Sequence, residues 1–250
     1  MSAFLEFLLR MGDNTLVLGH RVSEWCGHAP ILEEDIALAN TALDLIGQTQ
    51  MWLGLAAEVE GKGRTADDLA YRRDVIDFRN CLLTELPNRD FGHTLMRQFL
   101  FDTWHKLMLT RLCDSSDERV AAIAMKALKE VSYHLERSAD TVIGLGDGTE
   151  ESHAKMQAAL NRLWPYVGEM FEADRVDDLN AQEGVTVNPS ELRADYDRIV
   201  SEVMAEATLR IPDSRFAHRG GRDGSRHTEH LGHMLAVMQF LPRAYPDARW

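Results

Sequence analysis

The chain has 250 residues, 45% of them hydrophobic, and a formal net charge of −13 at pH 7. This length is enough to bury a large core in one domain. The strong negative charge argues against nucleic acid and anionic membrane surfaces as partners, and no apolar run reaches the roughly 18 residues that a membrane-spanning helix needs.

The N-terminal segment and the cysteines indicate a cytoplasmic protein. Residues 1–10 contain Glu6 within a short apolar run and no basic residue before it, which is unlike a secretory signal. The three cysteines, Cys26, Cys81 and Cys113, are widely separated and form no C-x-x-C motif. We therefore expect reduced thiols and no cysteine-based zinc or iron–sulfur site.

Two long helices are predicted in the first part of the chain. A first short helix is expected to start at Leu5, Leu8 and Leu9 and to be interrupted at residues 12–14, so the first long helix is predicted over about 15–27. It ends before Pro30, because proline cannot continue a helix. The second is predicted over about 32–60, where acidic residues in the first turn favour the helix dipole.

Two further long helices are predicted over about 89–112 and 117–145, with accessory helices after 149. The third helix is apolar almost all round, which indicates burial on most sides. A Gly- and Arg-rich stretch, 213–225, predicts a mobile loop. Four long helices joined by short turns predict an all-α, antiparallel four-helix bundle with accessory helices, forming a single domain over 1–250.

A dinuclear metal site in such a bundle needs one inward carboxylate on each helix and a Glu-x-x-His pair on two of them. On the fourth helix the inward pair is Val131 and His134, so the carboxylate is missing. On the second helix Asp44 is followed three residues later by Gly47, so the histidine is missing.

The remaining ligand-type residues have simpler interpretations. Glu24 could pair with Arg21, three residues earlier on the same helix. Asp102 could be neutralised by Lys106, four residues later. His105 could form a carboxylate–histidine pair with Asp102, but a hydrogen-bonded core histidine is the favoured interpretation.

Two other groups could bind a metal. Glu130 and His134 lie four residues apart, although Glu130 lies beside lysines and is predicted to be a surface or flanking residue. His227, His230 and His233 recur every three residues, which would place them on one helical face as a possible zinc site. Docking of that helix through hydrogen bonds is the favoured interpretation. We therefore predict no catalytic residue, no cofactor-binding residue and no metal site in this chain.

Four segments, 18–30, 43–48, 129–134 and 226–232, resemble the structural component, designated C, of the bacterial phenylacetyl-CoA 1,2-epoxidase (ring 1,2-monooxygenase) family. The resemblance covers essentially the whole chain and implies a ferritin-like fold. It implies a complex in which the C component supports a catalytic di-iron component, designated A, together with a small component B and a reductase carrying FAD and an iron–sulfur centre. The implied reaction is epoxidation of the ring of phenylacetyl-CoA in aerobic phenylacetate catabolism.

The ligand pattern of the catalytic component can be placed on this sequence. Four positions keep a ligand-type residue, namely Glu24, Asp44, Asp102 and His134, whereas Gly47 and Val131 do not. Glu24 and Asp44 would also differ by roughly 13 Å in height if a tight turn joined their helices.

The resemblance therefore implies a non-catalytic structural subunit that self-associates when isolated. The alternatives are an active di-iron oxygenase and a metal-free helical binding protein.

Overall fold

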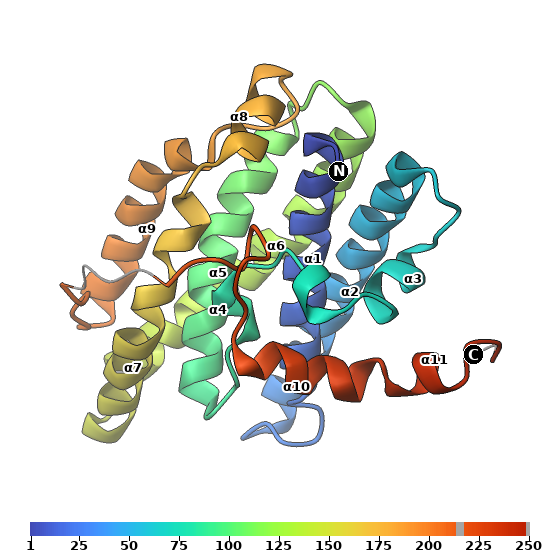
Figure 1. The fold of residues 1–250 in the computed structure, drawn as a ribbon. Helices are drawn as coiled ribbons and strands as arrows, with labels where there is room; N and C mark the ends of the chain where they lie inside the picture. The colour runs from blue at the N-terminus through green and yellow to red at the C-terminus, as the bar shows by residue number, and fades with distance from the viewer. Residues whose placement is uncertain (214–217, 249–250) are drawn as a thin grey trace.

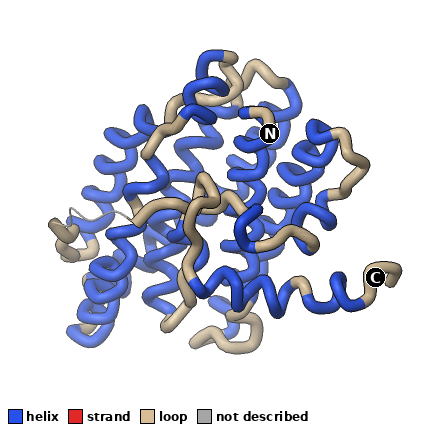
Figure 2. Tube along the Cα trace, in the orientation of Figure 1, coloured by secondary structure: helices blue, strands red, loops and turns tan. Residues whose placement is uncertain are grey.

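The computed structural model describes residues 1–213 and 218–248, and these residues form helices, turns and loops without a strand (Figures 1 and 2). The predicted all-α class is confirmed. Four long helices form the centre of the molecule: α1 (Ala3–Ser23), α2 (Leu32–Glu60), α5 (Phe91–Leu112) and α6 (Glu118–Gly146). α1 packs along α2, and α5 packs along α6.

Shorter helices surround these four. α7 and α9 pack against α5 and α6, and α8 packs against α1. α10 lies against the body, with Leu231 and Leu235 buried, and α11 continues from it toward the C-terminus (Figure 1). Their bounds are α3 (Ala66–Tyr71), α4 (Leu82–Glu85), α7 (Glu150–Leu163), α8 (Arg175–Gln182), α9 (Arg193–Glu206), α10 (Glu229–Met238) and α11 (Phe240–Ala244). Short 3₁₀ turns lie at Val75–Asp77, Trp164–Tyr166, Gly168–Phe171 and Pro189–Leu192.

The predicted helix over 32–60 is confirmed, and those over 89–112 and 117–145 are confirmed to within two residues. The prediction of 15–27 for the first helix is wrong, because α1 begins at Ala3 and ends at Ser23. Residues 12–14 do not interrupt it, since their polar groups find partners inside the protein. Asp13 pairs with Arg73, and Asn14 accepts a hydrogen bond from the N–H of Cys81 at 2.8 Å.

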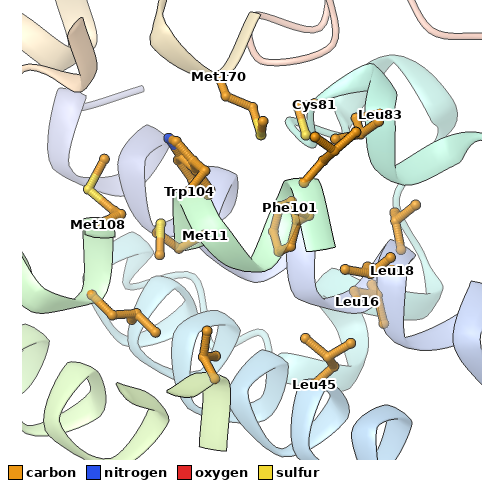
Figure 3. Packing of buried hydrophobic residues seen from close by; sticks show 14 of the residues in the cluster. Met11, Leu16, Leu18, Leu45, Cys81, Leu83, Phe101, Trp104, Met108 and Met170 are labelled. Carbon is orange, nitrogen blue, oxygen red and sulfur yellow. The ribbon is translucent and has the colours of Figure 1, made fainter. Parts of the chain in front are cut away.

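The buried hydrophobic side chains of the described residues form one cluster, which lies between the long helices and extends to the shorter helices packed on them. Figure 3 shows side chains from α1, α2 and α5 directed into this core, among them Leu16, Leu18, Leu45 and Phe101. Gly12 allows α1 to approach α2 closely, because a Cβ atom there would lie 2.5 Å from Leu53. No helix in the described part of the chain has the length and apolar character required to cross a bilayer.

Residues 218–228, which we call the C-terminal strap, cross the body without regular structure and are anchored by buried carboxylates. One oxygen of Glu169 accepts the backbone N–H groups of Gly220, Gly221 and Arg222 at 2.9, 2.7 and 3.2 Å. Buried Glu85 accepts from His227 at 2.5 Å and from the N–H and hydroxyl of Thr228 at 2.7 Å. The predicted irregular structure is confirmed for the described part of this stretch, which these contacts tie to the body. Residues 214–217 of that prediction lie outside the described residues.

The contact between His227 and Glu85 is expected to make stability depend on pH. Burial lowers the pKa of His227, but the hydrogen bond and the negative charge of Glu85 outweigh this and hold the pKa above its ordinary value. Because the pKa of this histidine is higher in the folded protein than in the unfolded chain, its protonation stabilises the fold. This contribution is complete at pH values below the unfolded pKa of about 6.5 and is lost as the pH rises through the folded pKa.

The free energy of unfolding, measured with denaturant between about pH 6 and pH 9, should therefore fall more steeply for the natural protein than for His227→Gln. Parallel pH curves for the two proteins would contradict this assignment.

Candidate functional site

Two hydrogen-bonded pairs of polar side chains join α2 to α6. Asp44 on α2 contacts His134 Nε2 on α6 at 2.9 Å, and one turn further along Gln48 donates to Glu130 at 2.9 Å. His134 is buried, whereas the Asp44 side chain is 38% exposed. Burial lowers the pKa of His134 despite the opposing effect of Asp44, so the neutral imidazole donates to the carboxylate. Glu130 is half-buried, in agreement with the flanking position predicted for it, and burial raises its pKa.

Asp102 on α5 is fully buried and makes a different set of contacts. Gln98 donates to one carboxyl oxygen at 2.8 Å, and the other oxygen has no hydrogen-bond partner among the described residues. Burial raises the pKa of Asp102 well above its ordinary value. The side chain is therefore favoured as a neutral carboxylic acid. The alternative in which Lys106 neutralises Asp102 is not supported, since the hydrogen-bond partner is Gln98.

His105 lies in the apolar core one turn after Asp102. Its ring packs against Phe101, with centroids 5.2 Å apart, and against Trp104, with centroids 6.2 Å apart. Burial lowers its pKa to about 3, so the ring is neutral. The core position was predicted correctly, but the predicted hydrogen bond is absent from the described residues, because neither ring nitrogen has a partner there.

The two positions without a ligand side chain have different surroundings. Val131 is fully buried and apolar. A Cβ atom added to Gly47 would meet nothing within 4 Å, so this position faces outward. Gln48 is the residue that faces α6 beside Asp44. A histidine at position 47 would therefore point away from His134.

Glu24 is bonded to a different set of residues. It is the C-cap of α1, with a side chain that is 45% exposed. Its carboxylate accepts from Arg21 at 2.8 Å and from Asn88 at 3.0 Å. The interpretation as an ion pair with Arg21 is confirmed. The placement of Glu24 as an inward ligand-type position is wrong, because α1 ends at Ser23 and the chain then turns outward before α2 begins.

These donors do not fit a di-iron centre. Within residues 1–213 and 218–248, no three His, Cys, Asp or Glu side chains lie close enough together to hold a metal ion. Asp44 and His134 are paired with each other, and Asp102 is bonded to Gln98. Each iron in a carboxylate-bridged pair requires several oxygen ligands, and buried Val131 supplies none.

The three late histidines do not share one helical face. His227 precedes α10, which begins at Glu229, so the expected three-residue stacking is wrong. His227 is bonded to Glu85 and to the carbonyl of Phe78 at 3.1 Å. The carbonyl of His230 accepts from Arg21 at 3.1 Å. For His227 the interpretation as a docking residue is confirmed.

Together these features define an all-α protein with buried carboxylate and histidine side chains that do not converge on one point. The family model described as phenylacetic acid catabolic protein matches residues 1–250, so the chain belongs to this family. The chain is 47% identical over 250 residues to the C component of the 1,2-phenylacetyl-CoA epoxidase of Escherichia coli (strain K12), and the match covers 100% of both chains. The resemblance predicted from the sequence is confirmed.

Proposed function

We propose that this chain is a non-catalytic structural subunit of a multicomponent phenylacetyl-CoA 1,2-epoxidase, in which it pairs with the catalytic di-iron component A and supports it during aerobic phenylacetate catabolism. The match to an epoxidase C component over its whole length supports membership of such a complex. The observation that supports the non-catalytic role is the side-chain pairing of Asp44 with His134, in which two ligand-type residues are hydrogen-bonded to each other.

The chain contributes packing rather than a reacting group in this proposal. The four long helices would form a ferritin-like antiparallel bundle whose interior is completed by Val131, His105 and a neutral Asp102. The di-iron centre would belong to component A, and FAD and an iron–sulfur centre would belong to the reductase. The small component B would complete the assembly. The free, separated cysteines Cys26, Cys81 and Cys113 support a cytoplasmic location.

Reconstitution tests this proposal. The purified chain is expected to contain far less than one iron per chain and to give no epoxidation of phenylacetyl-CoA with reductase alone. Adding it to components A and B and the reductase should restore activity that the mixture without it lacks. Iron content is measured by mass spectrometry of metals, and the product by liquid chromatography. Stoichiometric iron together with turnover by this chain and reductase alone would contradict the proposal.

A further inference from the structure

A row of polar side chains runs along a buried face of α5. Gln98, Asp102 and His105 are spaced by four and three residues, so they lie on one side of the helix. All three are buried, and α5 packs along α6, which carries buried His134. His134 lies near enough that its positive charge would add to the effect of burial in lowering the pKa of His105. We call these four side chains the interior group.

Five nitrogen and oxygen atoms of the interior group have no hydrogen-bond partner among the described residues. They are Oδ2 of Asp102, both ring nitrogens of His105, Nδ1 of His134 and Oε1 of Gln98. A buried polar atom that is left unpaired costs about 1–3 kcal/mol. Nearly all such atoms in native proteins are bonded to the protein or to ordered water. Five of them within one group therefore indicate a bound polar molecule.

The hydrogen-bonding character of these atoms selects the kind of molecule. Gln98 donates to Oδ1 of Asp102 at 2.8 Å, so the proton of the neutral carboxylic acid lies on Oδ2 and makes this oxygen a donor. Nε2 of His134 donates to Asp44, so Nδ1 is an acceptor. A neutral His105 ring has one donor and one acceptor nitrogen. The interior group thus offers both donors and acceptors, and it carries no charge.

These properties fit water and do not fit a cation. A metal ion requires deprotonated ligands, so the proton on Asp102 would have to leave. Val131, one turn before His134, is fully buried and supplies no negative charge that would favour this loss. Water both donates and accepts, and a buried water typically makes about three hydrogen bonds. The members of the interior group are at most 3% exposed, which limits the site to a molecule of this size.

We propose that an ordered water molecule binds between α5 and α6 and bridges Asp102 to His105 and His134. The water accepts a hydrogen bond from the carboxylic acid of Asp102. It donates to Nδ1 of His134 and to the acceptor nitrogen of His105. The bridge continues through His134 to Asp44, whose side chain is 38% exposed, and so connects the buried acid with the surface. This site is a property of the chain itself and is independent of the proposed epoxidase role.

A crystal structure of the purified natural chain tests the proposal directly. Electron density for a water is expected within about 2.5–3.2 Å of Oδ2 of Asp102 and of at least one imidazole nitrogen. Anomalous-scattering maps at the iron and zinc edges should show no peak there. A well-ordered interior group without this density, or with an anomalous peak in its place, would overturn the proposal.

Magnetic relaxation dispersion of ¹⁷O-labelled water counts long-lived internal waters in solution and allows a test by substitution. Asp102→Leu should lower the count by one relative to the natural protein, because it removes the donor. Asp102→Asn should keep the count, since the amide N–H replaces the acid O–H. Asp195→Leu, at an exposed position on α9, is the control and should also keep it.

Helical circular dichroism and a cooperative thermal transition establish that each variant is folded. A folded Asp102→Leu protein with the natural count would contradict the water bridge. If Asp102→Leu does not fold, the crystal structure of the natural chain decides.

Calorimetric titration of the natural chain with Zn²⁺ and Mn²⁺ separates water from a cation. Neither ion is expected to bind in the interior group. Binding of one ion per chain that Asp102→Asn abolishes would overturn the water site. The proposed function would fail on a different result, namely epoxidation of phenylacetyl-CoA by the metal-loaded chain with reductase alone.

Discussion

Replacing Asp13 with alanine is expected to lower the free energy of unfolding by about 3–5 kcal/mol, since it removes one partner of a buried ion pair. The Asp13 carboxylate accepts from Arg73 Nη1 at 3.0 Å and from the backbone N–H of Arg79 at 2.9 Å. The Arg73 side chain is only 4% exposed. The variant would leave this guanidinium buried without its carboxylate.

Chemical denaturation of the Asp13→Ala variant measures this loss. Asp74→Ala is the matched control, because Asp74 forms a solvent-exposed pair with Arg243 at 2.8 Å. Such exposed pairs contribute about 0–1 kcal/mol. If both variants lose a similar, small amount, the buried pair does not stabilise the fold as argued.

Asp102→Asn is expected to have the opposite effect and to raise the free energy of unfolding at pH 8, by about 1.4 kcal/mol for each unit by which burial raises the folded pKa of the carboxyl group. Burial raises the pKa of Asp102 in the folded protein. For a carboxyl group, a raised folded pKa means that stability falls as the pH rises from the unfolded value through the folded value. Asparagine resembles the neutral acid and does not ionise.

The advantage of Asp102→Asn should therefore grow between about pH 5 and pH 8, because the unfolded carboxyl group has a pKa of about 3.9. Denaturant unfolding at both pH values gives the comparison. Asp195→Asn, at an exposed position on α9, should show no such growth. A variant less stable than the natural protein at pH 8 would show that the carboxylate itself is needed in the core.

Helical periodicity was sufficient to predict α2 and α6, because their caps and apolar stripes are local features. Asp117 caps α6 by accepting from the N–H of Arg119 at 2.9 Å, and this signal is visible in the sequence. The continuity of α1 through residues 12–14 was not predictable in the same way. Asp13 and Asn14 have the composition of a loop, and they are accommodated in a helix only because Arg73 and Cys81, distant in the sequence, supply their partners.

In the candidate site, too, some features could be predicted from the local sequence and others could not. The contact between Asp44 and His134 follows from two helical stripes, and both residues were identified from the sequence. Gly47 itself faces outward, and Gln48 faces α6 beside Asp44, because each residue turns a helix by about 100°. Glu85 and Glu169 were missed as anchors. Glu85 had a detectable signal, because this acid lies among Leu82, Leu83 and Leu86.

The C-terminal strap also affects how the chain completes its folding. His227 and Glu85 are 142 residues apart, yet they meet inside the protein. Contacts between distant residues require closure of long loops and form late during folding. A chain that ends before residue 218 would bury Glu85 and Glu169 without the amide and imidazole groups that bind them. Synthesis of the last part of the chain is therefore required before the first part can reach its final stability.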